Sequence, residues 1–79
     1  MKKAYVLINC DIEKEEAVLL TLRKINSVTE AHGTFGAYDI IAEVKADTAE
    51  LLREVITWKI RKLPFIKSTL TLIGLEKQD

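Results

Sequence analysis

Apolar residues recur along the chain with two periods, that of a strand and that of a helix. Alternating patterns rich in β-branched and aromatic residues favour extended strands in four segments. These segments are residues 3–10, 27–36, 37–46 and 65–77. The first is apolar on both alternating sets, which predicts a strand covered on two faces. The second and third are joined by turn-forming residues at positions 35–37, which predicts a hairpin.

The segment of residues 12–26 has the apolar spacing of an amphipathic helix. Val18, Leu22 and Ile25 fall on one face, with Leu19 beside them. Asp11 precedes the segment, and we expect its side chain to cap the helix by accepting a bond from an orphan amide. Glutamates at positions 13, 15 and 16 suit the positive end of the helix dipole.

A second helix is predicted over residues 47–63. Asp47 opens it, and Glu50 follows three residues later, an Asp variant of the capping box. Pro64 ends it. Its apolar stripe is expected to comprise Leu51, Leu52, Val55, Ile56 and Ile60.

The resulting order, βαββαβ, predicts an α+β, ferredoxin-like fold with a four-stranded antiparallel sheet and two helices on one face. We expect Leu70 and Leu72 to point toward the helices. Thr69, Thr71 and Ile73 would then face outward, and the open sheet face would have an apolar centre of Leu7, Ile41 and Ile73. Monomers rarely expose such a patch, so the sequence predicts a homodimer formed through the open face.

Composition narrows the functions that this fold could serve. The 79 residues are 48% hydrophobic, which suits a single domain spanning residues 1–79 with a modest core. Because 12 basic and 12 acidic side chains cancel, we expect no direct binding of nucleic acid. No apolar run approaches the roughly 20 residues of a membrane span, and no secretory signal is apparent. The sequence therefore predicts a cytoplasmic protein without a membrane partner.

The sequence lacks the residues that several activities found on similar folds require. One cysteine and one histidine are too few soft ligands for a metal carrier, so no metal or other cofactor is expected. Acidic residues follow the first strand, where an acyl-phosphate hydrolase would need a basic, anion-binding loop. An RNA-binding sheet would need stacking aromatics with a basic stripe, and only Tyr5 and Phe35 are suitably placed.

Three single residues have plain structural interpretations. Cys10 is expected to be a small buried hydrophobe rather than a nucleophile. His32 has no matched serine, cysteine or second histidine, so we expect a solvated or hydrogen-bonded imidazole. Trp58 is flanked by basic residues and is expected to be a half-buried packing residue.

Gly36 and Asp39 interrupt the predicted hairpin strands and have two interpretations. Gly36 permits positive φ and close approach of a ligand to the backbone, and Asp39 adds one carboxylate. Together with the amides of residues 35–38, this carboxylate could bind the ammonium and carboxylate groups of an amino acid. Alternatively, both residues merely build a tight turn.

The stretch TFGAYDII resembles the ligand-binding, or RAM, domain of the Lrp/AsnC regulators, and the resemblance covers nearly the whole chain. That family has a Gly-x-Tyr-Asp turn, which corresponds here to residues 36–39, followed by an apolar strand. Its passage into the last strand is similar to LPFIKSTLT, in which Leu63, Pro64, Thr69 and Thr71 are kept and Phe65 replaces the usual glycine.

The resemblance implies a non-enzymatic, effector-binding regulatory domain without the helix-turn-helix of the full-length regulators. Its implied partners are a small-molecule amino acid, a second copy in a homodimer, a closed oligomer of dimers, and full-length Lrp/AsnC regulators. The implied ligand-binding residues are Thr34, Phe35, Gly36, Ala37, Tyr38, Asp39, Thr69 and Thr71.

Two other functions remain as alternatives. A small dimeric α+β barrel enzyme, of the monooxygenase or isomerase kind, would need titratable side chains between sheet and helices, where the predicted positions are almost entirely aliphatic. A ligand-free assembly module would need only the apolar sheet face.

Overall fold

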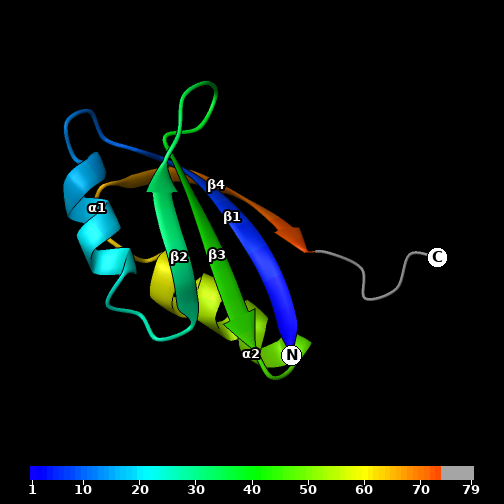
Figure 1. The fold of residues 1–79 in the computed structure, drawn as a ribbon. Coiled ribbons are helices and arrows are strands. Elements are labelled where there is room, and N and C mark those ends of the chain that lie inside the picture. The colour runs from blue at the N-terminus through cyan, green and yellow to red at the C-terminus, as the bar shows by residue number, and fades with distance from the viewer. Residues whose placement is uncertain (74–79) are drawn as a thin grey trace.

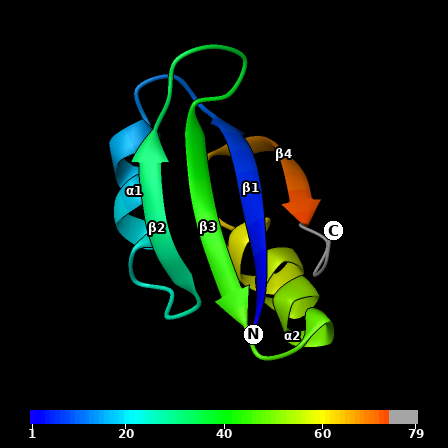
Figure 2. The same cartoon turned by 45° about the vertical axis from the view of Figure 1, so that its right-hand side comes forward.

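The computed structural model describes residues 1–73 and has the predicted βαββαβ order. Its elements are β1 (Lys2–Cys10), α1 (Glu15–Leu22), β2 (Val28–Gly33), β3 (Ile40–Ala46), α2 (Ala49–Glu54), the π-helix η1 (Val55–Ile60) and β4 (Ile66–Ile73). The strands form one antiparallel sheet in the order β2-β3-β1-β4. Both helices cover the same face of this sheet (Figures 1 and 2). The predicted ferredoxin-like fold is confirmed.

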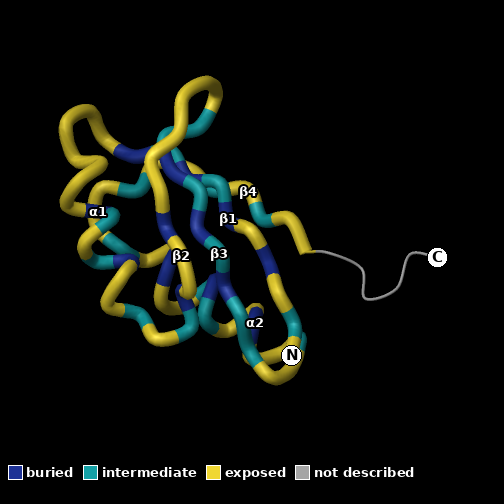
Figure 3. The backbone as a smooth tube through the Cα atoms, in the orientation of Figure 1, coloured by how far each residue is buried: buried dark blue, intermediate teal, exposed yellow. Residues whose placement is uncertain are grey.

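The core lies between the sheet and the helices, where the buried segments of the strands face α1 and α2 (Figure 3). Alternate residues of β1 and β3 supply most of the sheet side. The helices supply Val18, Leu22, Leu52, Ile56 and Ile60. Among the described residues this core contains only apolar side chains.

Both helices begin later than the sequence predicts. The amide of Lys14 donates to the carbonyl of Asp11 (3.0 Å), so these residues form a turn and Asp11 does not cap α1. Thr48, not Asp47, caps α2, with its hydroxyl accepting from the amide of Leu51 (3.1 Å). A hydroxyl one residue further on is the better placed acceptor for the orphan amides of the first turn.

The predicted stripe of the second helix is correct at four positions and wrong at one. Leu52, Ile56 and Ile60 are buried and Val55 packs against the core. Leu51 instead lies at the surface with 45% of its area exposed.

The predicted orientation of the last strand is wrong. In β4, Leu70 pairs with Leu7 and Leu72 pairs with Tyr5, so both leucines lie on the open face. Thr69, Thr71 and Ile73 pair with Ile8, Val6 and Ala4, all of which are buried beneath the helices. Large apolar residues occur at both the odd and the even positions of this strand. The alternating pattern alone therefore does not show which side faces the helices.

The open sheet face nevertheless has an apolar centre, formed by Tyr5, Leu7, Ile41, Leu70 and Leu72. Ile73 is not part of it. Residues 74–77 of the predicted last strand lie outside the described residues. Within residues 1–73, no helix has the length and apolar character needed to cross a membrane.

Candidate functional site

Residues 34–39 form a loop between β2 and β3 that stands beyond the end of the sheet (Figure 1). Two hydrogen bonds close its base. The amide of Thr34 donates to the carbonyl of Asp39 (2.8 Å), and the hydroxyl of Thr34 donates to the carbonyl of Tyr38 (2.6 Å). The loop is therefore pinned where it leaves the sheet, and its tip is free to contact another molecule.

Asp39 joins the loop to the central strand β1. Its amide donates to the carbonyl of Ile8 (2.9 Å), and its carboxylate accepts from the amide of Cys10 (3.0 Å). Because an ionised carboxylate has about four acceptor positions, this bond fixes the side chain and leaves capacity for a further donor. Asp39 thus has a structural role, as the second interpretation of the sequence expects, but through a bond to β1 that the sequence pattern did not reveal.

Cys10 ends β1 next to this carboxylate and is 5% exposed, as predicted for a small buried hydrophobe. Burial, followed by the negative charge of Asp39, raises the pKa of the Cys10 thiol above its usual value. Since the thiolate is the reactive form of cysteine, this environment keeps the thiol inert at neutral pH.

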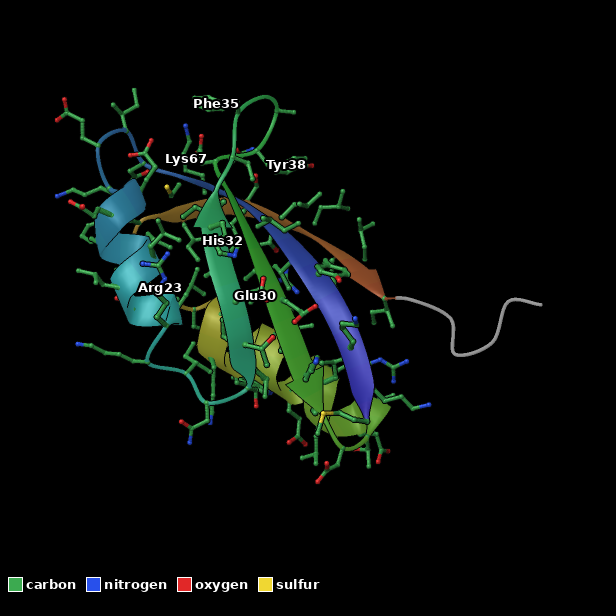
Figure 4. All side chains as sticks on the ribbon, in the orientation of Figure 1. Arg23, Glu30, His32, Phe35, Tyr38 and Lys67 are labelled. Carbon is green, nitrogen blue, oxygen red and sulfur yellow. The ribbon has the colours of Figure 1, made fainter. Side chains whose placement is uncertain are left out.

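Gly36 has φ +117°, in the region that favours glycine. A Cβ built on it would meet no atom within 4 Å, so the requirement at this position is conformational rather than steric. Phe35 beside it is fully exposed near the tip, and Tyr38 is half-buried near the base of the loop (Figure 4). The tip therefore combines accessible backbone with an exposed aromatic ring.

Thr69 and Thr71 do not join this group within one chain. They lie on the helix side of β4, which is separated from β3 by β1. At about 4.8 Å between neighbouring strands, β3 and β4 are roughly 10 Å apart. One chain thus brings together Thr34, Phe35, Gly36, Ala37, Tyr38 and Asp39, but not the two threonines.

Phe65 adopts the left-handed backbone conformation that a glycine would take, with φ +73°. Its carbonyl accepts from the amide of Asp11 (2.8 Å), and the ammonium of Lys14 lies 4.8 Å from the centre of its ring. These contacts hold the passage into β4 in the glycine-like shape despite the larger side chain.

The histidine is hydrogen-bonded, as predicted, with its Nε2 3.2 Å from the carboxylate of Glu30 on the same strand (Figure 4). Trp58 differs from its prediction, because 64% of its area is exposed. The ammonium of Lys62 lies 4.6 Å from the centre of its ring. Trp58 is therefore a surface residue and not a packing residue.

A polar network around Glu43 on the open sheet face was missed in the sequence. Its carboxylate accepts from the hydroxyls of Thr29 (2.6 Å) and Tyr5 (3.0 Å) and lies 3.6 Å from the ammonium of Lys3. The bond from Thr29, with help from Tyr5 and Lys3, lowers the pKa of Glu43. Tyr5 and Glu43 both fall on the alternate positions of their strands that point to the open face. This pattern in the sequence could have indicated the network.

The sequence of the chain matches a family model described as the Lrp/AsnC ligand binding domain over residues 3–78. It is also 30% identical, over 74 residues, to an uncharacterized helix-turn-helix transcriptional regulator of Pyrococcus furiosus. That match covers 90% of this chain and 49% of the regulator. The chain thus spans about half the length of the curated relative that it matches.

Solved structures give the same similarity. FFRP-DM1 superposes with a TM-score of 0.91 at 39% identity, covering 95% of this chain and 100% of that one. AsnC of E. coli superposes with a TM-score of 0.88 at 30% identity, covering 96% of this chain and 52% of that one. The similarity therefore includes the whole of a short chain and about half of a longer one.

Proposed function

Because the chain belongs to the Lrp/AsnC ligand-binding domain family, we propose that it is a non-enzymatic regulatory domain that binds a free amino acid at residues 34–39. Binding would act through assembly of the chain with copies of itself and with full-length regulators of the family.

The position of Asp39 carries this proposal. Bonds to the backbone of Ile8 and Cys10 fix its carboxylate at the base of an exposed loop. A fixed carboxylate is suited to an ammonium group because less side-chain freedom is lost when the ligand binds. The amides of residues 35–38 are the corresponding donors for the ligand carboxylate.

Assembly would complete the site. Thr69 and Thr71 lie two strands from Asp39 in one chain, so we propose that hydroxyls from this strand reach the ligand from another copy. The apolar open face of the sheet supports a dimer, since covering several hundred Å² at about 25 cal/mol per Å² is a substantial driving force. We propose a closed ring of such dimers, with the loops meeting where dimers touch.

The core argues against the alternative of a barrel enzyme. Such an enzyme would place titratable side chains between the sheet and the helices. Among residues 1–73, the buried side chains between the sheet and the helices are all apolar.

A thermal-shift screen of the standard amino acids tests the proposal. A ligand at about 100 times its Kd stabilises the folded state by about 2.7 kcal/mol, so at least one amino acid should raise the melting temperature clearly. The N-acetyl derivative of that amino acid lacks the ammonium group and should give no shift. A screen in which no amino acid stabilises the protein, or in which the acetylated form is equally effective, would contradict the proposal.

A further inference from the structure

A groove of about 580 Å³ lies at the end of the molecule opposite the loop of residues 34–39. One wall is a flank of α2 and η1, and the other is formed by the residues that lead into β2 and by the end of β3. None of residues 34–39 lines it. Volumes between about 300 and 1,000 Å³ are typical of sites for drug-sized molecules.

The helical wall of the groove is an apolar stripe formed by Leu51, Val55 and Trp58. These residues follow one another at helical spacing and lie beside the stripe that enters the core. Leu51 and Trp58 expose 45% and 64% of their area. Large apolar side chains gathered in a concave surface indicate a binding site more strongly than the same residues scattered singly.

The backbone of this wall is itself unusual. Val55–Ile60 form a π-helix, and the amide of Arg61 reaches back to the carbonyl of Ile56 (2.9 Å). Single π-turns within helices are rare and frequently occur at functional sites. Here the π-turn carries Trp58, while Ile56 and Ile60 stay buried.

The charged side chains that line the groove are two of each sign. Lys45 and Lys59 contribute two ammonium groups, and Asp47 and Glu54 contribute two carboxylates. A ligand with one charge of each sign matches this lining, whereas a ligand of high net charge does not.

We propose that this groove binds a zwitterion with a large apolar body, of the size of a short apolar peptide. Its apolar side chains would contact Leu51, Val55 and the ring face of Trp58 that Lys62 does not cover. The termini would pair with the charged side chains of both signs. This site shares no residue with the proposed amino-acid site, so either can fail without the other.

The experiment uses the fluorescence of Trp58, which is the single tryptophan of the chain. Titration with the dipeptide phenylalanyl-phenylalanine should produce a saturable change in its emission. Leu51→Asp, which places a charge on the apolar wall, should weaken binding by about tenfold or more. Leu20→Asp changes a similarly exposed leucine on α1, away from the groove, and should bind like the wild type.

Amide chemical shifts of the wild-type protein give a second readout that needs no variant. On addition of the dipeptide, shifts should change at positions 45–47 and 51–59. An unchanged Trp58 emission, shift changes confined to residues 34–39, or equal binding to Leu51→Asp would overturn the proposal. If the dipeptide capped at both ends bound as tightly as the free dipeptide, the proposal that the ligand is a zwitterion would be overturned.

Discussion

Glu13 and Phe65 both have positive φ, at +68° and +73°, although neither is a glycine. For residues with a side chain this conformation costs about 1–2 kcal/mol. Phe65 has compensating contacts through its carbonyl and its ring. Glu13 occupies the third position of the turn between Asp11 and Lys14, where glycine is the usual residue of a type II turn.

Glu13→Gly should therefore raise the free energy of unfolding by about 1 kcal/mol, because relief of the backbone strain exceeds the entropy added to the unfolded chain. Glu16→Gly, in the first turn of α1, should lower it by about 1 kcal/mol. Urea denaturation measures both. If the two variants were destabilised equally, the positive φ of Glu13 would carry no strain.

The raised pKa of Cys10 predicts a pH dependence of stability. Above about pH 8.5 the unfolded chain loses the thiol proton while the folded protein still holds it. The contribution of Cys10 is thus fully present at neutral pH and is lost as pH rises through the folded pKa. The free energy of unfolding of the wild type minus that of Cys10→Ala should decline across alkaline pH. A difference that stays constant or grows would contradict this account.

The residues of the loop show where sequence reasoning succeeds and where it stops. The positive φ of Gly36 follows from local chemistry, and so the sequence predicted it. The bond from Cys10 to Asp39 joins residues 29 positions apart, and it depends on the register of β1 with β3. Local sequence patterns do not show which residues of two strands pair. The bond from Cys10 to Asp39 could therefore not be predicted.

At the scale of the elements, the order and core of the fold were predictable because strong periodicity defines each segment. The boundaries were not, since competing turns and caps lie within a few residues of one another. The face of β4 was also ambiguous, and its register with β1 shifts between Asn9 and Cys10. Such an irregularity changes which side chains face the core without changing the apolar pattern.

The start of α2 gives a test at this scale. Thr48→Ala removes the hydroxyl that accepts from the amide of Leu51, and it should lower the free energy of unfolding by about 1 kcal/mol. Asp47→Ala lies one residue outside the cap and should have a clearly smaller effect. Chemical denaturation of the two variants decides between the positions, and a larger loss for Asp47→Ala would mean that the helix begins earlier.

For the whole molecule, the corrected orientation of β4 changes which substitution should disrupt the proposed dimer. Leu70 and Ile73 are almost equally exposed, at 44% and 47%, but only Leu70 lies on the open face. Leu70→Lys should dissociate the dimer, because it places a charge in the apolar centre, and Ile73→Lys should leave it intact. Light scattering measures both. A wild-type protein that is monomeric at micromolar concentration would contradict the proposed interface.

The molecule thus has two separate candidate sites at opposite ends of its sheet. The loop of residues 34–39 offers a fixed carboxylate beside an exposed tip, whereas the groove beside Trp58 offers apolar area and charged side chains of both signs. The open face of the sheet lies between these ends and is the surface through which copies would assemble.

Binding of an amino acid at Asp39 is the central claim, and calorimetric titration tests it most directly. The amino acid found by the thermal-shift screen is titrated into the wild type and into Asp39→Asn, which keeps the shape of the side chain and an acceptor for the amide of Cys10. Loss of a charge-assisted bond to the ligand ammonium should weaken binding by about 1.5–3 kcal/mol. Equal affinities of the two proteins would contradict the claim and would leave residues 34–39 as a structural turn.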